Sequence, residues 1–90
     1  MSFEINSGRP CVVVKQPGDT TPVEFPSPTL SLYVSGAQGT KIYFSKADRD
    51  ADTGHITIGA QGFWQAQAAV RGLYVVSSGP VEVAGFHITR

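Results

Sequence analysis

Apolar and polar residues alternate with a period of two through much of this 90-residue chain. Residues 30–35 place two leucines and a valine on one side of an extended backbone, with Tyr33 on the other side. Residues 41–45 place Ile42 and Phe44 on one side and lysine, tyrosine and serine on the other. The apolar side of the first segment consists of Leu30, Leu32 and Val34. Because only a short glycine-containing connection separates the two segments, they are predicted to pair as a β-hairpin.

Four further segments have strand composition and are separated by glycine, proline and serine turns. They are residues 11–16, 55–60, 73–76 and 81–88. The last two flank a Ser-Ser-Gly-Pro turn and are predicted to form a second hairpin, with Gly85 at a bulge. Residues 62–71 have enough alanine and glutamine for a helix, yet Trp64 and its neighbours also alternate as in a strand. We favour the extended conformation for this segment.

Short strands separated by turns every 8 to 12 residues or so are typical of antiparallel sandwiches and barrels. The sequence therefore predicts one all-β domain over residues 1–90, an antiparallel β-sandwich or small barrel of about six to eight short strands. Prolines at positions 22, 26 and 28 interrupt ladder pairing. Residues 17–29 are accordingly predicted to be a proline-rich loop or arm.

Three aspartates occupy alternate positions after the strand predicted at 41–45, as in a calcium-binding loop: Asp48, Asp50 and Asp52. Such a loop also needs a glycine at its sixth position and a bidentate carboxylate at its twelfth. Counted from Asp48, these positions hold Thr53 and Gly59 instead, so neither requirement is met. The pattern favours a solvated hairpin turn in which Asp52 accepts local backbone hydrogen bonds and Gly54 takes a positive φ. A weak calcium site is the alternative.

Residue types that support catalysis are few and lack partners in the sequence. His55 and His87 both lie in predicted strands, without a nearby nucleophile or metal-ligand pattern. The single cysteine, Cys11, lies in an apolar run and is predicted to be a buried free thiol. The glycines punctuate strands and none has the spacing of a phosphate-binding loop. We expect no enzymatic activity, and no cofactor apart from the alternative calcium ion.

Charge and composition favour protein over nucleic acid or anionic lipid as a partner. Seven lysines and arginines balance seven aspartates and glutamates, and the formal net charge is zero. A neutral chain lacks the field that attracts nucleic acid or anionic lipid, so neither is expected as a partner. Only 16% of the residues are charged, which is below the usual share of about 25% and suits contact with other protein. Without an apolar run of signal-peptide or membrane-span length, we expect synthesis in the cytoplasm.

Aromatic side chains are the best candidates for an interaction surface. The candidate interface residues are Tyr33, Tyr43, Trp64 and Tyr74. The tyrosines are predicted opposite the aliphatic rows of their strands, where their apolar ring and polar hydroxyl suit protein interfaces and also stacking on sugars. For Tyr33 and Tyr43, an interface and ordinary surface are both open. For Trp64, a place in the second core layer of a sandwich is favoured.

The order "IYFSK…HITIGAQGFWQAQAAVRGLYVVSSGPVEVAGFHI", within residues 41–88, resembles small structural proteins of tailed bacteriophage virions. In those proteins a strand and loop lead to a glycine, aromatic and small-residue segment, then to "LYV", a Ser/Gly turn and a final valine-rich strand. The resemblance implies a β-sandwich that docks on a capsid, connector or tail scaffold and often forms trimers or rings. It assigns no individual functional residue. The first half of the chain has no such resemblance.

Two functions from different classes follow as expectations. The first is a non-enzymatic structural protein of a bacteriophage particle, a capsid decoration or cement protein that binds identical subunits and a major capsid or other virion protein. Its location would be the virion, assembled in the host cytoplasm. The alternative is a small carbohydrate- or receptor-binding β-module, in which Tyr33, Tyr43 or Trp64 stacks on sugar rings and the aspartate loop adds a calcium-assisted edge.

Overall fold

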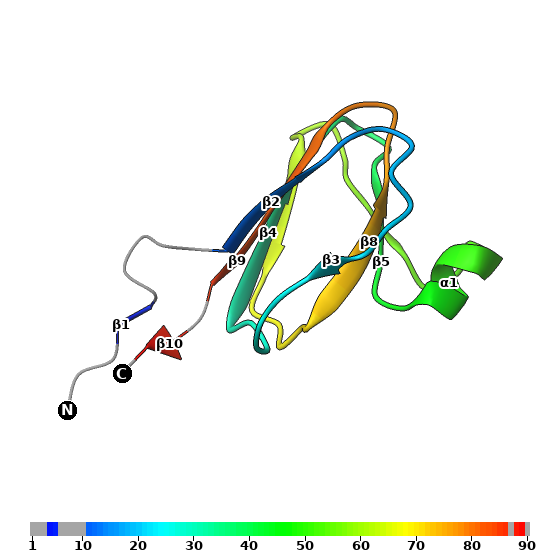
Figure 1. Ribbon diagram of the computed structural model, residues 1–90. Coiled ribbons are helices and arrows are strands. Elements are labelled where there is room, and N and C mark those ends of the chain that lie inside the picture. The colour runs from blue at the N-terminus through cyan, green and yellow to red at the C-terminus, as the bar shows by residue number, and fades with distance from the viewer. Residues whose placement is uncertain (1–3, 6–10, 87, 90) are drawn as a thin grey trace.

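Two antiparallel four-stranded sheets pack face to face in the computed structural model, which describes residues 4–5, 11–86 and 88–89 (Figure 1). The first sheet has the order β2 (Cys11–Lys15), β9 (Val81–Phe86), β4 (Ser31–Ser35) and β7 (Phe63–Ala66). The second has the order β3 (Val23–Glu24), β8 (Gly72–Val76), β5 (Lys41–Tyr43) and β6 (Ile56–Thr57). The predicted all-β sandwich is confirmed.

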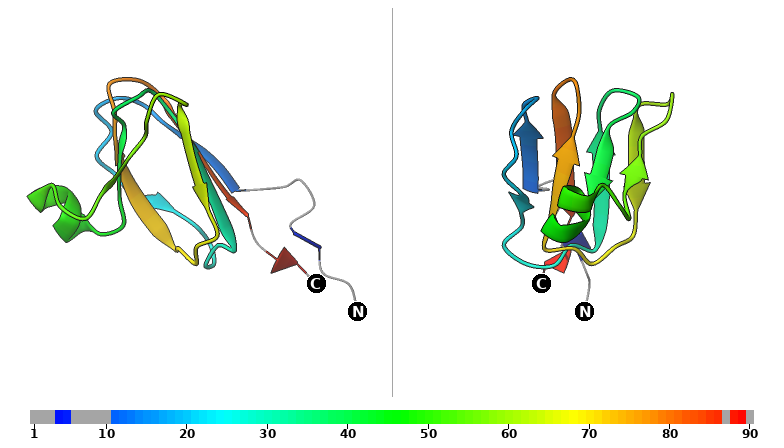
Figure 2. Two further views of the ribbon diagram at one scale, coloured as in Figure 1. Left: turned by 180° about the vertical axis from the view of Figure 1, so that it is seen from behind. Right: turned by 90° about the vertical axis from the view of Figure 1, so that its right-hand side faces the viewer.

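Three short elements lie outside the two sheets. β1 (Glu4–Ile5) and β10 (Ile88–Thr89) pair with each other in antiparallel fashion. They lie beside the end of the first sheet, near both chain termini (Figures 1 and 2). Helix α1 (Lys46–Ala51) projects on the opposite side, beyond the second sheet (Figure 1).

The core is the layer of aliphatic and aromatic side chains that the two sheets enclose. Its buried members are Val23, Phe25, Leu32, Val34, Ile42, Ile58, Leu73, Val75, Val81 and Val83. Each strand contributes alternate residues, because successive side chains of an extended backbone point to opposite faces. The half-buried Cys11 and Trp64 pack against this layer.

Both predicted hairpins are wrong, because the chain changes sheet between the paired segments. β4 lies in the first sheet, between β9 and β7, whereas β5 lies in the second sheet, between β8 and β6. β8 and β9 are likewise in different sheets. Every connection from β2 to β9 changes sheet, except the one between β5 and β6.

The connection between β4 and β5 is held by groups that belong to both layers. The Gly36 N–H donates to the carbonyl of Gly62, in the loop before β7, while the Thr40 carbonyl accepts from the N–H of Ile58, after β6. The Thr40 hydroxyl, which is buried, lies 2.7 Å from the hydroxyl of Ser77. These long-range bonds carry the chain over the end of the sandwich.

Two residues at strand ends also depart from the predicted alternation. Leu30 precedes β4, and Phe44 follows the last residue of β5, where the chain turns to enter α1. Both side chains are exposed rather than buried. The period of two holds only while the backbone stays extended within a ladder.

The proline-rich segment 17–29 contributes to the sandwich. Within it, β3 pairs with β8 at the edge of the second sheet, and Phe25 is buried in the core. Prolines 22 and 26 flank β3 and limit it to two residues. Residues 63–66 form β7, so the extended conformation favoured for this part of 62–71 is confirmed.

Gly85 does not form the predicted bulge, since β9 keeps a continuous register with both neighbours from Val81 to Phe86. It lies under the connection that joins β3 to β4. A Cβ atom at Gly85 would lie 2.6 Å from Cε1 of Phe25 and 2.8 Å from Cγ2 of Thr29. Thr29 cannot easily retreat, because its hydroxyl donates to the carbonyl of Ala68 and accepts from the N–H of Val70.

We therefore expect Gly85→Ala to lower the free energy of unfolding by about 1–3 kcal/mol, as overpacking does in a well-filled core. Chemical denaturation monitored by tryptophan fluorescence measures the change. Gly79→Ala is the matched control, because nothing lies within 4 Å of a Cβ at that position. Equal stability of the two variants would contradict the packing role assigned to Gly85.

Candidate interaction surface

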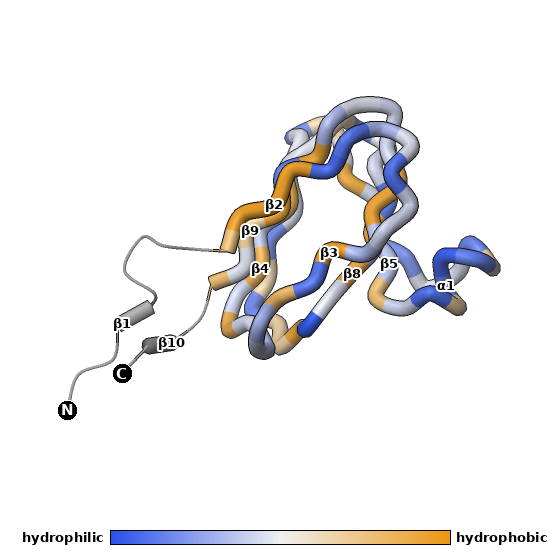
Figure 3. The backbone as a smooth tube through the Cα atoms, in the orientation of Figure 1, coloured by the Kyte–Doolittle hydropathy of each residue, from blue (hydrophilic) through white to orange (hydrophobic). Residues whose placement is uncertain are grey.

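The outer face of the first sheet keeps apolar side chains exposed to solvent on both of its edge strands. In β2, Val12 and Val14 point outward and keep 50% and 53% of their surface exposed. In β7, Phe63 keeps 39%. Figure 3 shows β2 as one of the longest continuous hydrophobic stretches of the backbone. Solvent-facing strands of antiparallel sheets are usually polar, so this face is a candidate for contact with a partner.

Strand β2 is also an edge of its sheet, with β9 as its one neighbour among the described strands. The only charged side chain of β2 is Lys15, which points inward and is almost fully buried. Its ammonium group lies 2.6 Å from the Thr21 hydroxyl and 3.1 Å from Asp19 Oδ2. The edge strand β2 therefore ends in an ion pair between the buried Lys15 and the partly exposed Asp19, and it carries apolar side chains on its outward face.

The Asp19 carboxylate is well suited to hold that lysine. It accepts hydrogen bonds from the hydroxyl and the N–H of Thr21 and from Lys15, and these lower its pKa to about 2. The carboxylate is therefore ionised throughout the neutral range. This arrangement fixes the loop after β2 at one end of the edge.

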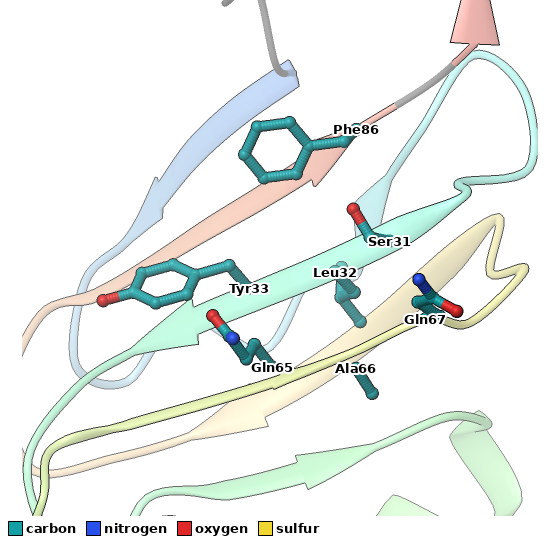
Figure 4. Close-up of a pocket in the computed structure, with 7 residues that line it drawn as sticks. All are labelled: Ser31, Leu32, Tyr33, Gln65, Ala66, Gln67 and Phe86. Carbon is teal, nitrogen blue, oxygen red and sulfur yellow. The ribbon is translucent and has the colours of Figure 1, made fainter. Parts of the chain in front are cut away.

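A groove of about 310 Å³ lies farther across the same face, over β9, β4 and β7 (Figure 4). Its outward side chains are Ser31, Tyr33, Gln65, Gln67 and Phe86. The sheet register explains why they meet. Tyr33 is the ladder partner of Gln65, and Ser31 is the partner of Phe86. Leu32 and Ala66 lie at the base and alternate toward the core.

Of the four aromatic residues predicted to form an interface, Tyr33 is the one that lies on the outer face of the first sheet. Its ring stacks on that of Phe63, with 5.8 Å between centroids and 21° between planes. Trp64 points inward and packs half-buried against the core, as favoured from the sequence. Tyr74 lies on the outer face of the second sheet, under the Arg49 guanidinium, whose carbon is 4.8 Å from the ring centroid.

Tyr43 points to the outer face of the second sheet, as predicted, since it is the ladder partner of Tyr74, but it is covered there and only 3% of its surface is accessible. Its hydroxyl donates to Asp52 Oδ1, and its ring lies 5.3 Å from that of His55. The chain after α1 thus folds back over this residue. Helix α1 forms where a loop is predicted, and it brings Asp52 and His55 over Tyr43. The alternation of residues in the strand alone does not predict this cover.

The aspartate segment is a short helix and not the predicted hairpin loop. Ser45 caps α1 by accepting a hydrogen bond from the Asp48 N–H, and Asp52 ends the helix in the left-handed conformation with φ 54°. A helical repeat places Asp48 and Asp50 on different sides of α1. Gly54 has the predicted positive φ, 60°.

Each of the three aspartates has its own partner. Asp48 accepts from the Thr53 hydroxyl, and Asp50 pairs with Arg49. Asp52 accepts from the Tyr43 hydroxyl and pairs with Lys41 at 3.2 Å, instead of accepting the local backbone bonds predicted for it. Within the described residues, no three acidic, histidine or cysteine side chains are grouped as metal ligands.

Hydrogen bonding and charge shift both pKa values in the Tyr43–Asp52 pair. The hydrogen bond to Asp52, with burial, raises the pKa of Tyr43 to about 12. The same bond, together with Lys41, lowers the pKa of Asp52 below its usual 3.8. His55 Nδ1 lies 3.6 Å from Asp52 Oδ1 and is buried without a hydrogen-bond partner among the described residues. His87 lies outside the described residues.

Comparison of the chain with models of known protein families, with curated sequences and with solved structures finds no match. The described residues include no helix of the length and hydropathy that crossing a membrane requires. The class that the fold defines is an antiparallel β-sandwich, and the outer face of its first sheet keeps Val12, Val14 and Phe63 exposed.

Sequence reasoning missed most of the groove. Gln65 and Gln67 lie in the segment for which helix and strand both remained open, and Ser31 and Phe86 lie in predicted strands that are 55 positions apart in the chain. A signal for the outer face was present in Val12 and Val14, which continue an unbroken apolar run where a solvent-facing strand would alternate.

Substituting Asp52 by asparagine should lower the pKa of Tyr43 from about 12 toward the ordinary 10.0, because the carboxylate that holds the phenolic proton is removed. Asparagine tolerates the left-handed conformation found at this position. Ultraviolet titration of tyrosinate measures the shift. Asp50→Asn, which leaves the Tyr43 contact intact, should not change the titration, and an equal shift in both variants would contradict the assignment.

The two shifted pKa values set the pH range over which the Tyr43–Asp52 hydrogen bond stabilises the folded chain. Because the folded-state pKa of Tyr43 is raised, its contribution is complete below about pH 10 and is lost as the pH rises toward 12. The lowered pKa of Asp52 gives a contribution that is complete above the unfolded pKa, near 3.8, and is lost as the pH falls below it. The difference in unfolding free energy between the native chain and Asp52→Asn should therefore shrink at both extremes.

Calcium should leave the melting temperature unchanged, since the three aspartates engage three separate partners. Differential scanning calorimetry with millimolar calcium and with chelator makes the comparison. A rise in melting temperature that Asp48→Asn abolishes would restore the metal-site hypothesis.

Proposed function

We propose that this chain is a non-enzymatic structural protein of a bacteriophage particle, a capsid decoration or cement protein that joins identical chains and docks on a major shell protein. The observation that carries the proposal is β2, which is an edge strand among the described residues and keeps Val12 and Val14 half exposed. The resemblance of residues 41–88 to phage structural proteins supports the choice of a phage particle.

The β2 sequence suits pairing with a second copy of itself. In an antiparallel pair centred on Val13, Val12 of one copy faces Val14 of the other, and the two-fold axis repeats this contact. Such pairing satisfies the unpaired backbone groups of the edge and removes the exposed valines from water. Zero net charge adds no repulsion between copies.

The other sheet edges are less suited to this role. β3 and β6 have two residues each, and prolines flank β3. Edge pairing requires several consecutive ladder positions, because each contributes only a small net free energy. Five-residue β2 offers the longest edge of the two sheets.

Light scattering after size exclusion tests self-association. The native chain should elute as a dimer or larger assembly, and Val12→Lys combined with Val14→Lys should reduce it to the 9.6 kDa monomer. Lysines placed on an edge strand oppose strand pairing. Val76→Lys is the matched control, because Val76 is an equally exposed valine (48%) on the second sheet.

The virion part of the proposal requires a separate measurement. Mass spectrometry of phage particles purified from the host that encodes the chain should detect it in fixed stoichiometry to the major shell protein. A chain that stays monomeric at all concentrations and is absent from particles would contradict the proposal.

A further inference from the structure

The groove over β9, β4 and β7 has a chemistry that differs from that of the valine edge. Its outward side chains combine two aromatic rings, one hydroxyl and two amides: Phe86, Tyr33, Ser31, Gln65 and Gln67. No residue that lines it is charged. A lining of this kind suits a ligand that is neutral and has both apolar and hydroxyl-bearing surface.

The two rings lie on diagonal positions of neighbouring strands, and Ser31 lies opposite Phe86 in the ladder (Figure 4). Diagonal neighbours in an antiparallel sheet are about 7–8 Å apart, which leaves room for a flat ring-shaped group between or upon the aromatic faces. Phe63 stacks on Tyr33 but does not line the groove, so it supports the tyrosine ring from outside. The Tyr33 ring is therefore held in place before a ligand arrives.

Gln65 and Gln67 stand two residues apart on one side of the extended chain, so both side chains face the groove. Each amide offers two N–H donors and one carbonyl acceptor. Neighbouring hydroxyls of a sugar ring can each donate and accept, so an amide can bond two of them at once. Both side chains are exposed, and little has to be displaced besides water.

We propose that this groove binds a neutral glycan chain, with pyranose rings stacked on Tyr33 and Phe86 and their hydroxyls bonded by Gln65, Gln67 and Ser31. The proposal does not rest on the structural function proposed above. The two are compatible, because pairing through the β2 edge extends the sheet sideways and leaves the outer face over β4 and β7 open.

The sheet order further favours an extended polymer over a small compact ligand. β7 is the edge strand on the groove side, with β4 as its neighbour in the sheet. The groove therefore continues to the margin of the face, and a chain longer than the groove can pass beyond it. Charged polysaccharides find no counter-charge among the lining residues.

Affinity electrophoresis in native gels that contain dextran, mannan or galactan tests the proposal. At least one of these neutral polysaccharides should retard the native chain in proportion to its concentration, and carboxymethyl dextran should not. Tyr33→Ala should weaken the retarding affinity about tenfold or more, because the stacking platform is lost. Tyr33→Phe should retain most of the affinity, since the ring remains.

A second variant tests the groove independently, in case Tyr33→Ala does not fold. Gln65→Glu combined with Gln67→Glu changes two exposed side chains without altering their size, and should also abolish retardation. Gln38→Ala is the matched control, because that exposed glutamine lies in the connection between β4 and β5 and does not line the groove. Melting temperatures of all variants establish that the sandwich is intact.

Absence of retardation by all three neutral polysaccharides would overturn the proposal, as would equal retardation of the native chain and the double glutamate variant. Selective binding of a proline-rich peptide, the other neutral ligand that aromatic grooves accept, would overturn the glycan assignment in favour of a peptide site. Failure here is distinguishable from failure of the structural proposal, because the Val12 and Val14 substitutions should leave retardation unchanged.

Discussion

Face-to-face packing of two small sheets is the constraint on which the rest of this molecule depends. Neither sheet has an apolar face large enough to be stable alone, and, among the described residues, ten buried side chains from the two layers meet in one core. The chain satisfies this by crossing from one sheet to the other at nearly every connection. Contacts between residues distant in sequence therefore hold each strand in place.

Those crossings explain several local features that otherwise look unrelated. Thr40 is buried where the chain enters β5 from the first sheet, and its hydroxyl meets that of Ser77, where the chain leaves the neighbouring strand β8 for the first sheet. The Thr29 hydroxyl links the β3–β4 connection to residues 68 and 70 by hydrogen bonds, and its methyl group lies close to Gly85. In each case a small polar residue satisfies backbone groups at a point where the ladder hydrogen bonds stop.

The two outer faces of the sandwich differ in how much of each is covered by other parts of the chain. The second sheet is covered in part by α1 and the residues that follow it, so Tyr43 and Tyr74 are engaged by Asp52 and Arg49. The first sheet has no comparable cover among the described elements, and its outer face keeps the valines of β2 and the groove beside Tyr33. This asymmetry is the reason why both proposals concern the first sheet.

The sequence by itself determined the all-β class and the inward residues of the longer strands, since a period of two is imposed by the extended backbone and can be counted, as at Leu32 and Val34. Only the tertiary structure decided which strands pair. Loop lengths suggested hairpins, but the connection at Thr40 spans two layers, and nothing in a local pattern records which sheet a strand joins. The groove was assembled for the same reason, because its strands are neighbours in space and distant in sequence, whereas Tyr43 is buried by Asp52 and His55, which fold back over it after α1.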